Sequence, residues 1–286
     1  MAALPLHDGA LQIFNVEHGA CALLTMPPAG NCHRILIDCG HNASIGWYPG
    51  PHLRQLGVTQ LQLLVVTNYD EDHVSGFRNL IEQGLNVHQI LRNPAVTPAV
   101  IAYLKTEDGM GPGIDALVRV LTNVPQVDVV GNQFPLPNGV SMEWFWNPYP
   151  HFDDENNLSL VVVLDVYGFK FMFPGDMEKR GFQNLLNTNA RFRAIVSEIS
   201  VLVASHHGRE NGICEEMFDT WGCRPKLVVI SDDYKQHATQ ETTNYYGNKA
   251  QGINGFRLDQ GLRRVLTTRS DGELMFTFQS GQCLVS

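Results

Sequence analysis

The chain has 286 residues, of which 44% are hydrophobic and 17% charged, and its formal net charge is −9 at pH 7. This composition is typical of a folded globular protein and excludes a disordered chain. No basic run is longer than two residues, so we expect long nucleic acid to bind weakly and with a steep salt dependence, because such binding needs lysine and arginine to neutralise phosphates.

The N-terminal residues lack the basic and apolar regions of a signal peptide, and no apolar stretch approaches the length of a membrane span. The six cysteines show no CxxC pairing. We therefore expect a soluble, cytoplasmic protein with reduced thiols and no membrane partner.

The N-terminal half of the chain predicts strands joined by short turns, followed by helices. Strands are expected over 11–16, 21–26 and 34–38, in the succession of a β-meander. Further on, the apolar pattern predicts helices over 51–56, 74–83 and 98–123, with a glycine-rich break at 109–113, and strands over 61–66 and 87–91.

The C-terminal half alternates between strands and helices. Strands are expected over 126–130, 140–146, 158–166, 169–173, 201–204 and 227–230, and helices over 177–186 and 189–198. Residues 239–251 are polar and predict an irregular, mobile loop on the substrate side. The chain is expected to finish in a hairpin of strands 264–268 and 274–278 around an Asp-Gly turn.

One of these apolar strands runs directly into side chains that bind metals. Asp70, Glu71, Asp72 and His73 follow the strand over 61–66. Placing such charges against an apolar strand end is unfavourable unless a cation neutralises them. Carboxylates suit hard cations, and imidazole suits zinc, iron or manganese. Taken alone, the segment is equally explained by a solvated, acidic helix N-terminus.

Two more strand ends favour the metal interpretation. Asp176 follows the strand over 169–173, and His206 and His207 follow the strand over 201–204. Ligands at the carboxyl ends of strands converge on one edge of a sheet. Three such endings in one chain therefore predict a metal site.

The ordered motifs resemble those of hydrolases with the metallo-β-lactamase fold, and within that superfamily the competence-protein, DNA-uptake branch. The matching motifs are ILIDCG at 35–40, NYDEDH at 68–73, NNLSLV at 156–161, GD at 175–176 and HHG at 206–208. The resemblance runs from about residue 11 to the end of the chain. It implies an α/β fold, the four-layer αββα metallo-β-lactamase sandwich, as a single domain over residues 1–286.

The chain departs from the family pattern in the first metal-binding loop, where Asn68 and Asp70 replace two histidines. A carboxylate can replace an imidazole as a ligand, whereas a neutral amide binds metal weakly. A third family histidine is absent, and Asn157 stands near its place. The resemblance thus implies one tight metal position and one weak position that includes Asp70, and Asn68→His is expected to strengthen the weak one. The tight position would consist of Asp72, His73, Asp176 and His207.

The resemblance also implies roles for single side chains. Asp176 would bind the metal and bridge to a second ion, and Asp72 would bind metal or act as a base. His206 would orient a ligand or protonate the leaving group. Asp38 would support a metal-binding histidine from behind. Two further histidines, His18 and His237, are candidates for the pocket wall, with a surface turn as the alternative for His18.

The implied function is that of a metal-dependent hydrolase with Zn or Mn as its divalent cofactor, because a bound cation makes hydroxide available near neutral pH. Substrates in this superfamily are often phosphodiesters, so we expect a phosphodiesterase or nuclease acting on a nucleotide or nucleic acid. Two alternatives are open. One is a catalytically degenerate binding or assembly module, and the other is a redox diiron relative of the same fold.

Overall fold

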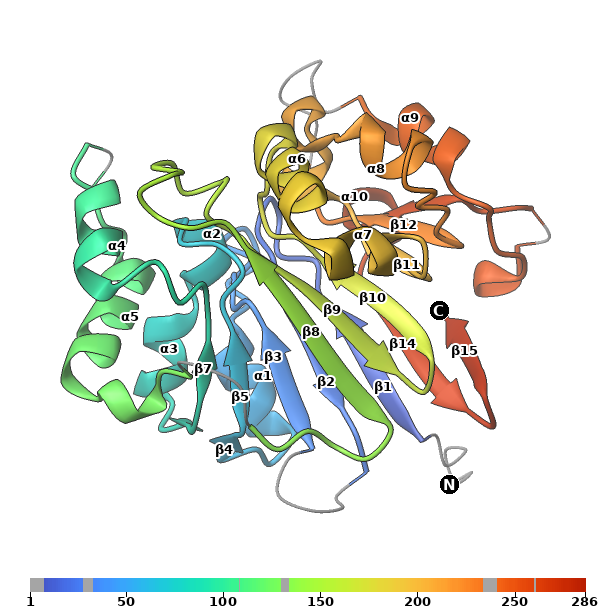
Figure 1. The fold of residues 1–286 in the computed structure, drawn as a ribbon. Coiled ribbons are helices and arrows are strands. Elements are labelled where there is room, and N and C mark those ends of the chain that lie inside the picture. The colour runs from blue at the N-terminus through green and yellow to red at the C-terminus, as the bar shows by residue number, and fades with distance from the viewer. Residues whose placement is uncertain (1–7, 28–32, 108, 130–133, 234–240, 260) are drawn as a thin grey trace, which may run out of the picture.

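The computed structural model describes residues 8–27, 33–107, 109–129, 134–233, 241–259 and 261–286. Two β-sheets stack face to face, and helices cover the outer face of each sheet (Figure 1). One apolar core lies between the two sheets. A second core lies between the first sheet and its helices, and a third lies between the second sheet and its helices. The predicted four-layer αββα sandwich is therefore confirmed.

The first sheet has seven strands among the described residues, in the spatial order β15-β14-β1-β2-β3-β5-β7. In that order they cover Gln282–Val285, Leu274–Gln279, Gly9–Ile13, Ala22–Thr25, Arg34–Ile37, Leu63–Val65 and Ile90–Leu91. Strands β1, β2 and β3 form the predicted antiparallel meander, and β5 and β7 continue the sheet in parallel with β3. Because β3 and β5 are parallel, Asp38 and the 68–73 loop follow them at the same edge of the sheet.

The second sheet has six strands in its described part, in the order β13-β12-β11-β10-β9-β8. In that order they cover Val265–Thr267, Leu227–Ile230, Val201–Val203, Phe169–Phe173, Leu160–Val166 and Val140–Trp146. Strands β10 to β13 are parallel to one another, so the segments after β10 and β11 emerge at one edge. A separate parallel pair consists of β4 (Gln60–Leu61) and β6 (Asn86–Val87).

In the described ranges, helices form the two outer layers, together with four short 3₁₀ turns. The first layer and its flank contain α1 (Pro49–Gln55), α2 (Glu71–Val74), α3 (Phe77–Glu82), α4 (Pro98–Leu104) and α5 (Pro112–Asn123). The C-terminal part contains α6 (Lys179–Thr188), α7 (Ala190–Val196), α8 (Glu215–Asp219), α9 (Thr243–Lys249) and α10 (Thr268–Asp271). The 3₁₀ turns are η1 (Pro125–Val127), η2 (Ser205–Gly208), η3 (Glu210–Gly212) and η5 (Phe256–Leu258).

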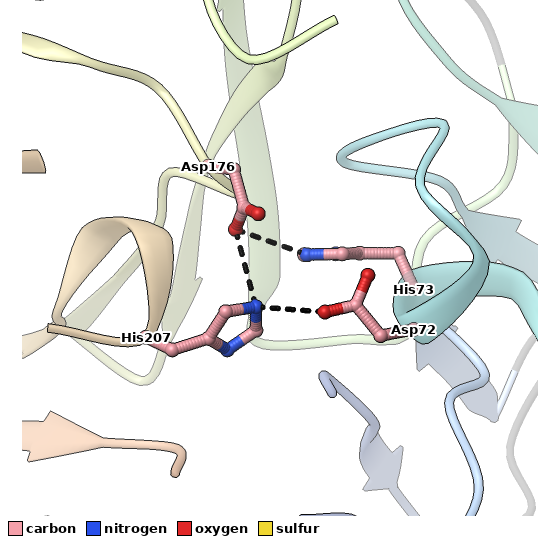
Figure 2. Close-up of side chains that lie close together, drawn as sticks. All are labelled: Asp72, His73, Asp176 and His207. Atoms are coloured by element: carbon pink, nitrogen blue, oxygen red, sulfur yellow. Dashed lines mark hydrogen bonds and ion pairs between the residues drawn. The ribbon is translucent and has the colours of Figure 1, made fainter. Parts of the chain in front are cut away.

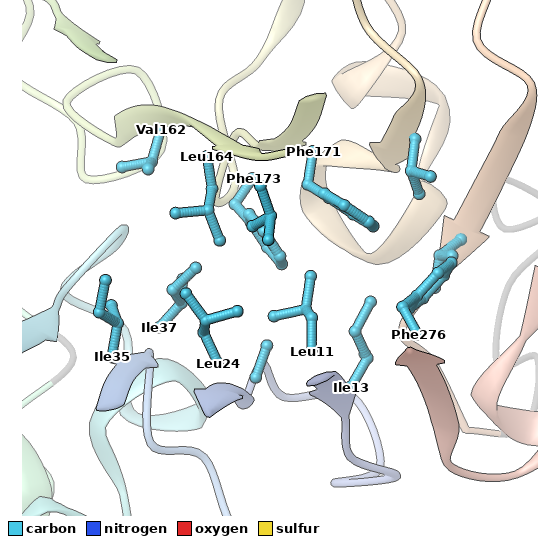
Figure 3. Close-up of a cluster of buried hydrophobic side chains, with 14 of the residues drawn as sticks. Leu11, Ile13, Leu24, Ile35, Ile37, Val162, Leu164, Phe171, Phe173 and Phe276 are labelled. Atoms are coloured by element: carbon cyan, nitrogen blue, oxygen red, sulfur yellow. The ribbon is translucent and has the colours of Figure 1, made fainter. Parts of the chain in front are cut away.

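Alternating apolar side chains fill the space between the two sheets (Figure 3). Ile35 and Ile37 of β3 belong to this core, while Leu36 between them packs in the helix layer. Val162 and Leu164 contribute from the facing strand β9. A period of two is what strand geometry dictates, and each such buried side chain contributes about 1.5–3 kcal/mol. The core thereby fixes the strand ends of both sheets relative to one another.

The loop after β5 is fastened to the helix layer by Glu71. Its carboxylate oxygens accept hydrogen bonds from the backbone N–H groups of Gly113 (2.8 Å) and Ile114 (3.1 Å). These N–H groups lie in the first turn of α5 and have no partner within the helix, and a negative charge is favoured at that end of the helix. Glu71 therefore caps α5 and positions the loop.

The predicted C-terminal hairpin of 264–268 and 274–278 is wrong. Strand β13 pairs in parallel with β12 in the second sheet, whereas β14 pairs antiparallel with β1 and β15 in the first sheet. Helix α10 connects them across the sandwich. The hairpin turn of this region is at Ser280 and Gly281, whose φ angles of 51° and 76° suit a type I′ turn.

The predicted strand over 126–130 is also wrong in its described part. The 3₁₀ turn η1 occupies its start, and only an isolated bridge joins Asp128 to Ile90. Pro125 explains the difference, because proline fits the first turn of a helix and cannot donate a hydrogen bond to a strand partner.

Two further segments differ from the sequence prediction. The helix expected over 74–83 is divided into α2 and α3 at Gly76, where a Cβ atom would lie 2.4 Å from the Cys39 carbonyl oxygen. The described part of the loop expected over 239–251 contains helix α9, whose Tyr246 side chain is buried in the third core. In both cases tertiary packing overrides the local pattern.

Candidate metal centre

Four side chains from the three strand ends meet at one edge of the sandwich (Figure 2). They are Asp72 and His73 of α2, Asp176 after β10, and His207 after β11. One ligand atom of each lies within 4.8 Å of the others. The structure thus brings together the four residues of the predicted tight position, and we call this group the metal centre, a candidate site for a divalent cation.

Close backbone packing holds Asp72 in place. Its carbonyl oxygen accepts a long hydrogen bond from the N–H of Ala20 (3.3 Å). A Cβ atom on Gly19 or Gly40 would lie 2.5 Å or 2.3 Å from that same oxygen. Only glycine permits such an approach, so the β1–β2 turn and the loop after β3 together fix the Asp72 backbone.

His206, His207 and Gly208 form a strained turn after β11. All three have left-handed backbones, with φ angles of 52°, 53° and 75°. For a non-glycine residue this conformation costs roughly 1–2 kcal/mol, and it persists where the surrounding structure enforces it. A hydrogen bond from the N–H of His206 to the Gly175 carbonyl (3.1 Å) ties the turn to the segment that carries Asp176.

His73 lies between two carboxylates. Its Nδ1 is 2.9 Å from Asp38 Oδ2, and its Nε2 is 3.0 Å from Asp176 Oδ1. Asp38 is itself fixed by a hydrogen bond from the N–H of Thr67 (2.7 Å). Burial disfavours the charged imidazolium, but the Asp176 and Asp38 carboxylates outweigh burial and raise the pKa of His73 well above its usual value. Asp38 therefore lies behind a histidine of the metal centre.

His207 presents a buried nitrogen to the same group. Its Nδ1 donates to the Ser231 carbonyl (3.1 Å), and its Nε2 lies 3.2 Å from Asp72 Oδ2 and 3.5 Å from Asp176 Oδ1. Within the described part of the chain, this Nε2 has no hydrogen bond of acceptable geometry. Burial opposes its charged form, yet Asp176 and Asp72 raise the pKa of His207 to about 10.

The donor set fits a divalent cation. Each Nδ1 faces an oxygen acceptor, so the proton of the neutral ring is on Nδ1 and Nε2 carries a lone pair. That lone pair faces carboxylate oxygens, which is repulsive unless a proton or a metal ion lies between them. Burial favours the neutral acid of Asp176, but His207 and His73 hold its pKa well below the usual range, so it is ionised. Two imidazoles and two carboxylates suit zinc, manganese or iron.

His206 lies beside the metal centre and outside the four-residue group. Its Nε2 is 3.9 Å from Asp176 Oδ2 and accepts a hydrogen bond from Arg209 Nη1 (3.1 Å). Its Nδ1 is 3.7 Å from Glu178 Oε1. Burial lowers the pKa of His206, and the Asp176 charge only partly offsets it. The imidazole is therefore mostly neutral at pH 7.

Asn68 is fully buried, and the protein uses both ends of its amide. Nδ2 donates to Ser159 Oγ (3.0 Å) and weakly to the Glu155 carbonyl (3.4 Å), and Oδ1 accepts from the N–H of Asp70 (2.7 Å). Ser159 Oγ also accepts from the N–H of Asp176 (3.1 Å). Asn68 thus braces the loop against the segment that precedes β9.

Asp70 pairs with a lysine and does not belong to the four-residue group. Its Oδ1 contacts Lys105 Nζ, which also lies 2.9 Å from Glu155 Oε1. Only 5% of the Lys105 side chain is exposed. Burial, with the Asp72 and Asp176 charges, raises the pKa of Asp70 despite Lys105. Lys105 is affected differently, because hydrogen bonds to both carboxylates outweigh burial and raise its pKa. Because Asp70 contacts Lys105 directly and Glu155 lies beside the same ammonium, we interpret Asp70 and Lys105 as an ion pair. We call Asp70, Lys105 and Glu155 the Lys105 cluster.

Few features of the sequence indicate this cluster. Lys105 follows an apolar helix as the only charged residue of 98–105, and a single lysine at a helix end is ordinary. That isolation is the one signal available. Arg209, which contacts His206, was not predicted as a site residue either, because an arginine after the HHG motif is not by itself a ligand pattern.

The remaining predicted pocket residues are Asn157, His18 and His237. Asn157 holds the start of α6, because its Oδ1 accepts from the N–H of Gly181 (2.7 Å). His18 is half-buried in the β1–β2 turn, next to Gly19, whose carbonyl accepts from Ser231 Oγ (2.8 Å). His237 lies outside the described residues.

Comparison with known proteins supports the resemblance seen in the motifs. The chain is 24% identical over 288 residues to ComE operon protein 3 of Bacillus subtilis, a competence-branch protein. The chain has the metallo-β-lactamase fold. The match covers 96% of this chain and 33% of the relative, so the chain spans about a third of the length of ComE operon protein 3. No protein-family model matches the chain.

Several solved structures align with most of the chain at low identity. Igni18, a metallo hydrolase of Ignicoccus hospitalis, has 13% identity and a TM-score of 0.47, with 94% of this chain and 100% of Igni18 covered. A diphosphatase of the PhnP family has 9% identity and a TM-score of 0.46, with 96% and 99% covered. CmlA, a diiron β-hydroxylase of Streptomyces venezuelae, has 12% identity and a TM-score of 0.46, with 85% and 51% covered. At these values the alignments do not bear on activity.

Finally, none of the helices in the described ranges combines the length and the apolar character that a bilayer span requires.

Proposed function

We propose that this chain is a metal-dependent hydrolase of phosphoester bonds, with phosphodiesterase or nuclease activity. The observation that carries the proposal is the convergence of two imidazole Nε2 atoms and two carboxylates in the metal centre. Asp72, His73, Asp176 and His207 would hold one Zn or Mn ion tightly. When bound, such a cation would act as a Lewis acid on a substrate oxygen and would lower the pKa of a bound water.

The surrounding residues suit this role. Asp38 and the Ser231 carbonyl hold the Nδ1 atoms of His73 and His207, which leaves both Nε2 atoms for the cation. Asp72 is the most exposed member of the metal centre, with 40% of its side chain accessible, against 5% or less for the others. Incoming water and substrate therefore meet Asp72 first, and we assign it as the base that accepts a proton from the attacking water.

An arginine beside the metal centre favours an anionic substrate. Arg209 lies against His206, which in turn is close to Asp176. A guanidinium supplies paired donors that match phosphate oxygens. We therefore assign Arg209 to a substrate phosphate and His206 to the orientation of that phosphate and its leaving group, and we propose a nucleotide or nucleic acid as the substrate.

We also propose that residues 1–286 act as one metallo-β-lactamase-like domain in the cytoplasm. The two sheets support a single domain, because the C-terminal strand β14 pairs with the N-terminal strand β1. The five cysteines of the described part are free thiols, which is typical of a reducing compartment.

The decisive experiment strips the purified chain with a chelator, reloads it with Mn or Zn, and measures bound metal together with hydrolysis of bis(p-nitrophenyl) phosphate. We expect a tightly held ion and turnover that depends on it. A chain that binds no ion would overturn the proposal. A bound ion without turnover of any phosphoester would favour the alternative, a binding or assembly module, which the buried and fully hydrogen-bonded Asn68 makes the second candidate.

A further inference from the structure

The Lys105 cluster places a positive charge where the altered loop is expected to hold its weaker metal ion. Asp70 stands in the motif at the place of a family histidine, and its carboxylate is in contact with the Lys105 ammonium. Glu155, from the segment before β9, closes the cluster from the other side at 2.9 Å. Two carboxylates lie around one cation, as in part of a metal coordination shell, and the Lys105 ammonium takes the place of the metal ion.

The ammonium is enclosed rather than solvated. Lys105 is the C-cap residue that follows α4, yet only 5% of its side chain is exposed. Lysine is almost never buried unless it is paired, and here both partners come from distant loops. Glu155 is 19% exposed and Asp70 34% exposed, so the cluster borders solvent on the Asp70 side.

Rigid contacts join this cluster to the metal centre. Asp70 precedes Asp72 by two residues, and its N–H is held by Asn68. The amide of Asn68 donates to Ser159 Oγ, the atom that also accepts from the N–H of Asp176. The Lys105 cluster is thus connected to Asp72 along the chain and to the backbone N–H of Asp176 through the hydrogen bonds of Asn68 and Ser159.

A second divalent ion does not fit beside this arrangement. Asn68 Oδ1 already accepts the Asp70 N–H, and a neutral amide binds metal weakly. Asp70 Oδ1 is in contact with the Lys105 ammonium, and a divalent ion within a few ångströms of that ammonium would be strongly repelled. To enter, a second ion has to displace Lys105 from both carboxylates.

We propose that Lys105 is a tethered cation that replaces the second metal ion, so that the metal centre holds one divalent ion and the ammonium neutralises Asp70 and Glu155. The proposal rests on the proposed metal centre. It predicts a weak second position for a more direct reason than the loss of a histidine, because a cation that belongs to the chain competes for the Asp70 and Glu155 carboxylates.

The test counts ions. Wild type, Lys105→Met and Lys105→Arg are titrated with Mn²⁺ by calorimetry, and bound Mn²⁺ is examined by electron paramagnetic resonance for the coupled signal of two neighbouring ions. We expect one tight ion in wild type and in Lys105→Arg, which keeps the charge. Lys105→Met should bind a second ion at least tenfold more tightly than wild type does and should show the coupled signal. Lys179→Met, which removes an exposed ion-pair lysine, is the matched control and should behave as wild type.

Each other outcome has a defined meaning. Two tight ions in wild type, or a folded Lys105→Met that still binds one ion, would overturn the role of Lys105 while leaving the proposed hydrolase intact. A wild type that binds no Mn²⁺ or Zn²⁺ would overturn the metal centre and this inference with it. If Lys105→Met does not fold, Asp70→Asn decides: the tight ion should keep its affinity within threefold, whereas a loss of more than tenfold would show that Asp70 serves the ion and not the lysine.

Discussion

The metal centre and the Lys105 cluster begin on the same loop and differ in how their charges are balanced. In the metal centre, the buried His207 Nε2 has no acceptable hydrogen bond to any residue that the structure describes, and two imidazoles face two carboxylates. In the Lys105 cluster, one ammonium satisfies two carboxylates. Asp70 and Asp72, two positions apart in the sequence, therefore differ: Lys105 neutralises Asp70, whereas Asp72 belongs to the group that fits a metal ion. A motif therefore predicts where charged side chains lie close together. Whether they need a metal ion depends on residues from distant segments, such as Lys105 beside Asp70.

The largest expected effect follows removal of the carboxylate that contacts both imidazoles. Asp176→Ala should abolish phosphodiester turnover and reduce bound metal by more than about 100-fold, the upper end of losses seen for outer-shell partners. Circular dichroism should show an intact fold. Metal analysis and the phosphodiester assay measure the result, with Asp219→Ala on the exposed end of α8 as the control. Wild-type turnover in Asp176→Ala would refute the metal-hydrolase assignment.

The second effect concerns the other side of the comparison. Lys105→Met leaves the Asp70 and Glu155 carboxylates without their cation and should destabilise the protein by about 3 kcal/mol, the low end for a broken buried ion pair, because Asp70 is partly exposed. Urea unfolding measures the change, and added Mn²⁺ should restore part of the stability in this variant more than in wild type. Equal stability of the variant and wild type without metal would mean that the Lys105 cluster contributes nothing.

A smaller effect is expected for the residue behind His73. Asp38→Asn places an amide N–H against His73 Nδ1 and so favours the tautomer whose proton is on Nε2, the nitrogen that the ion requires. Metal affinity should fall about 10–100-fold with the number of bound ions unchanged. Competition with a calibrated chelator measures it. Unchanged affinity would show that Asp38 supports the fold alone.

The smallest effect on metal binding is expected at Asn68. The motif alone predicts that Asn68→His strengthens a second ion, but the side chain is fully buried and hydrogen-bonded to Ser159 and Asp70. We therefore expect no added ion and a loss of about 1–2 kcal/mol of stability from the broken hydrogen bonds. Calorimetry and urea unfolding on the same samples distinguish these outcomes. A second tight ion in this variant would restore the prediction from the motif.

Much of the architecture follows from local patterns. The strand over Leu227–Ile230 is buried throughout and ends where its apolar run ends, because a strand buried on both faces must be continuously apolar. Segments with weak patterns were misjudged. The final strands were expected to pair with each other, yet β13 and β14 lie in different sheets, and no local feature records which sheet a short strand joins.

From the sequence, the resemblance of the ordered motifs predicts the αββα layers and groups Asp72, His73, Asp176 and His207, and the ends of three apolar runs locate them along the chain. Parallel strands bring their carboxyl ends to one edge within a sheet, but β5 belongs to the first sheet and β10 and β11 to the second, so the stacking of the two sheets brings the four side chains together. The contact between Asp70 and Lys105, 35 positions apart along the chain, and the place of Glu155 beside them follow from the three-dimensional fold alone. An ion pair between distant loops depends on where helix α4 ends in space, and hydrophobic periodicity and motif spacing carry no information about that position.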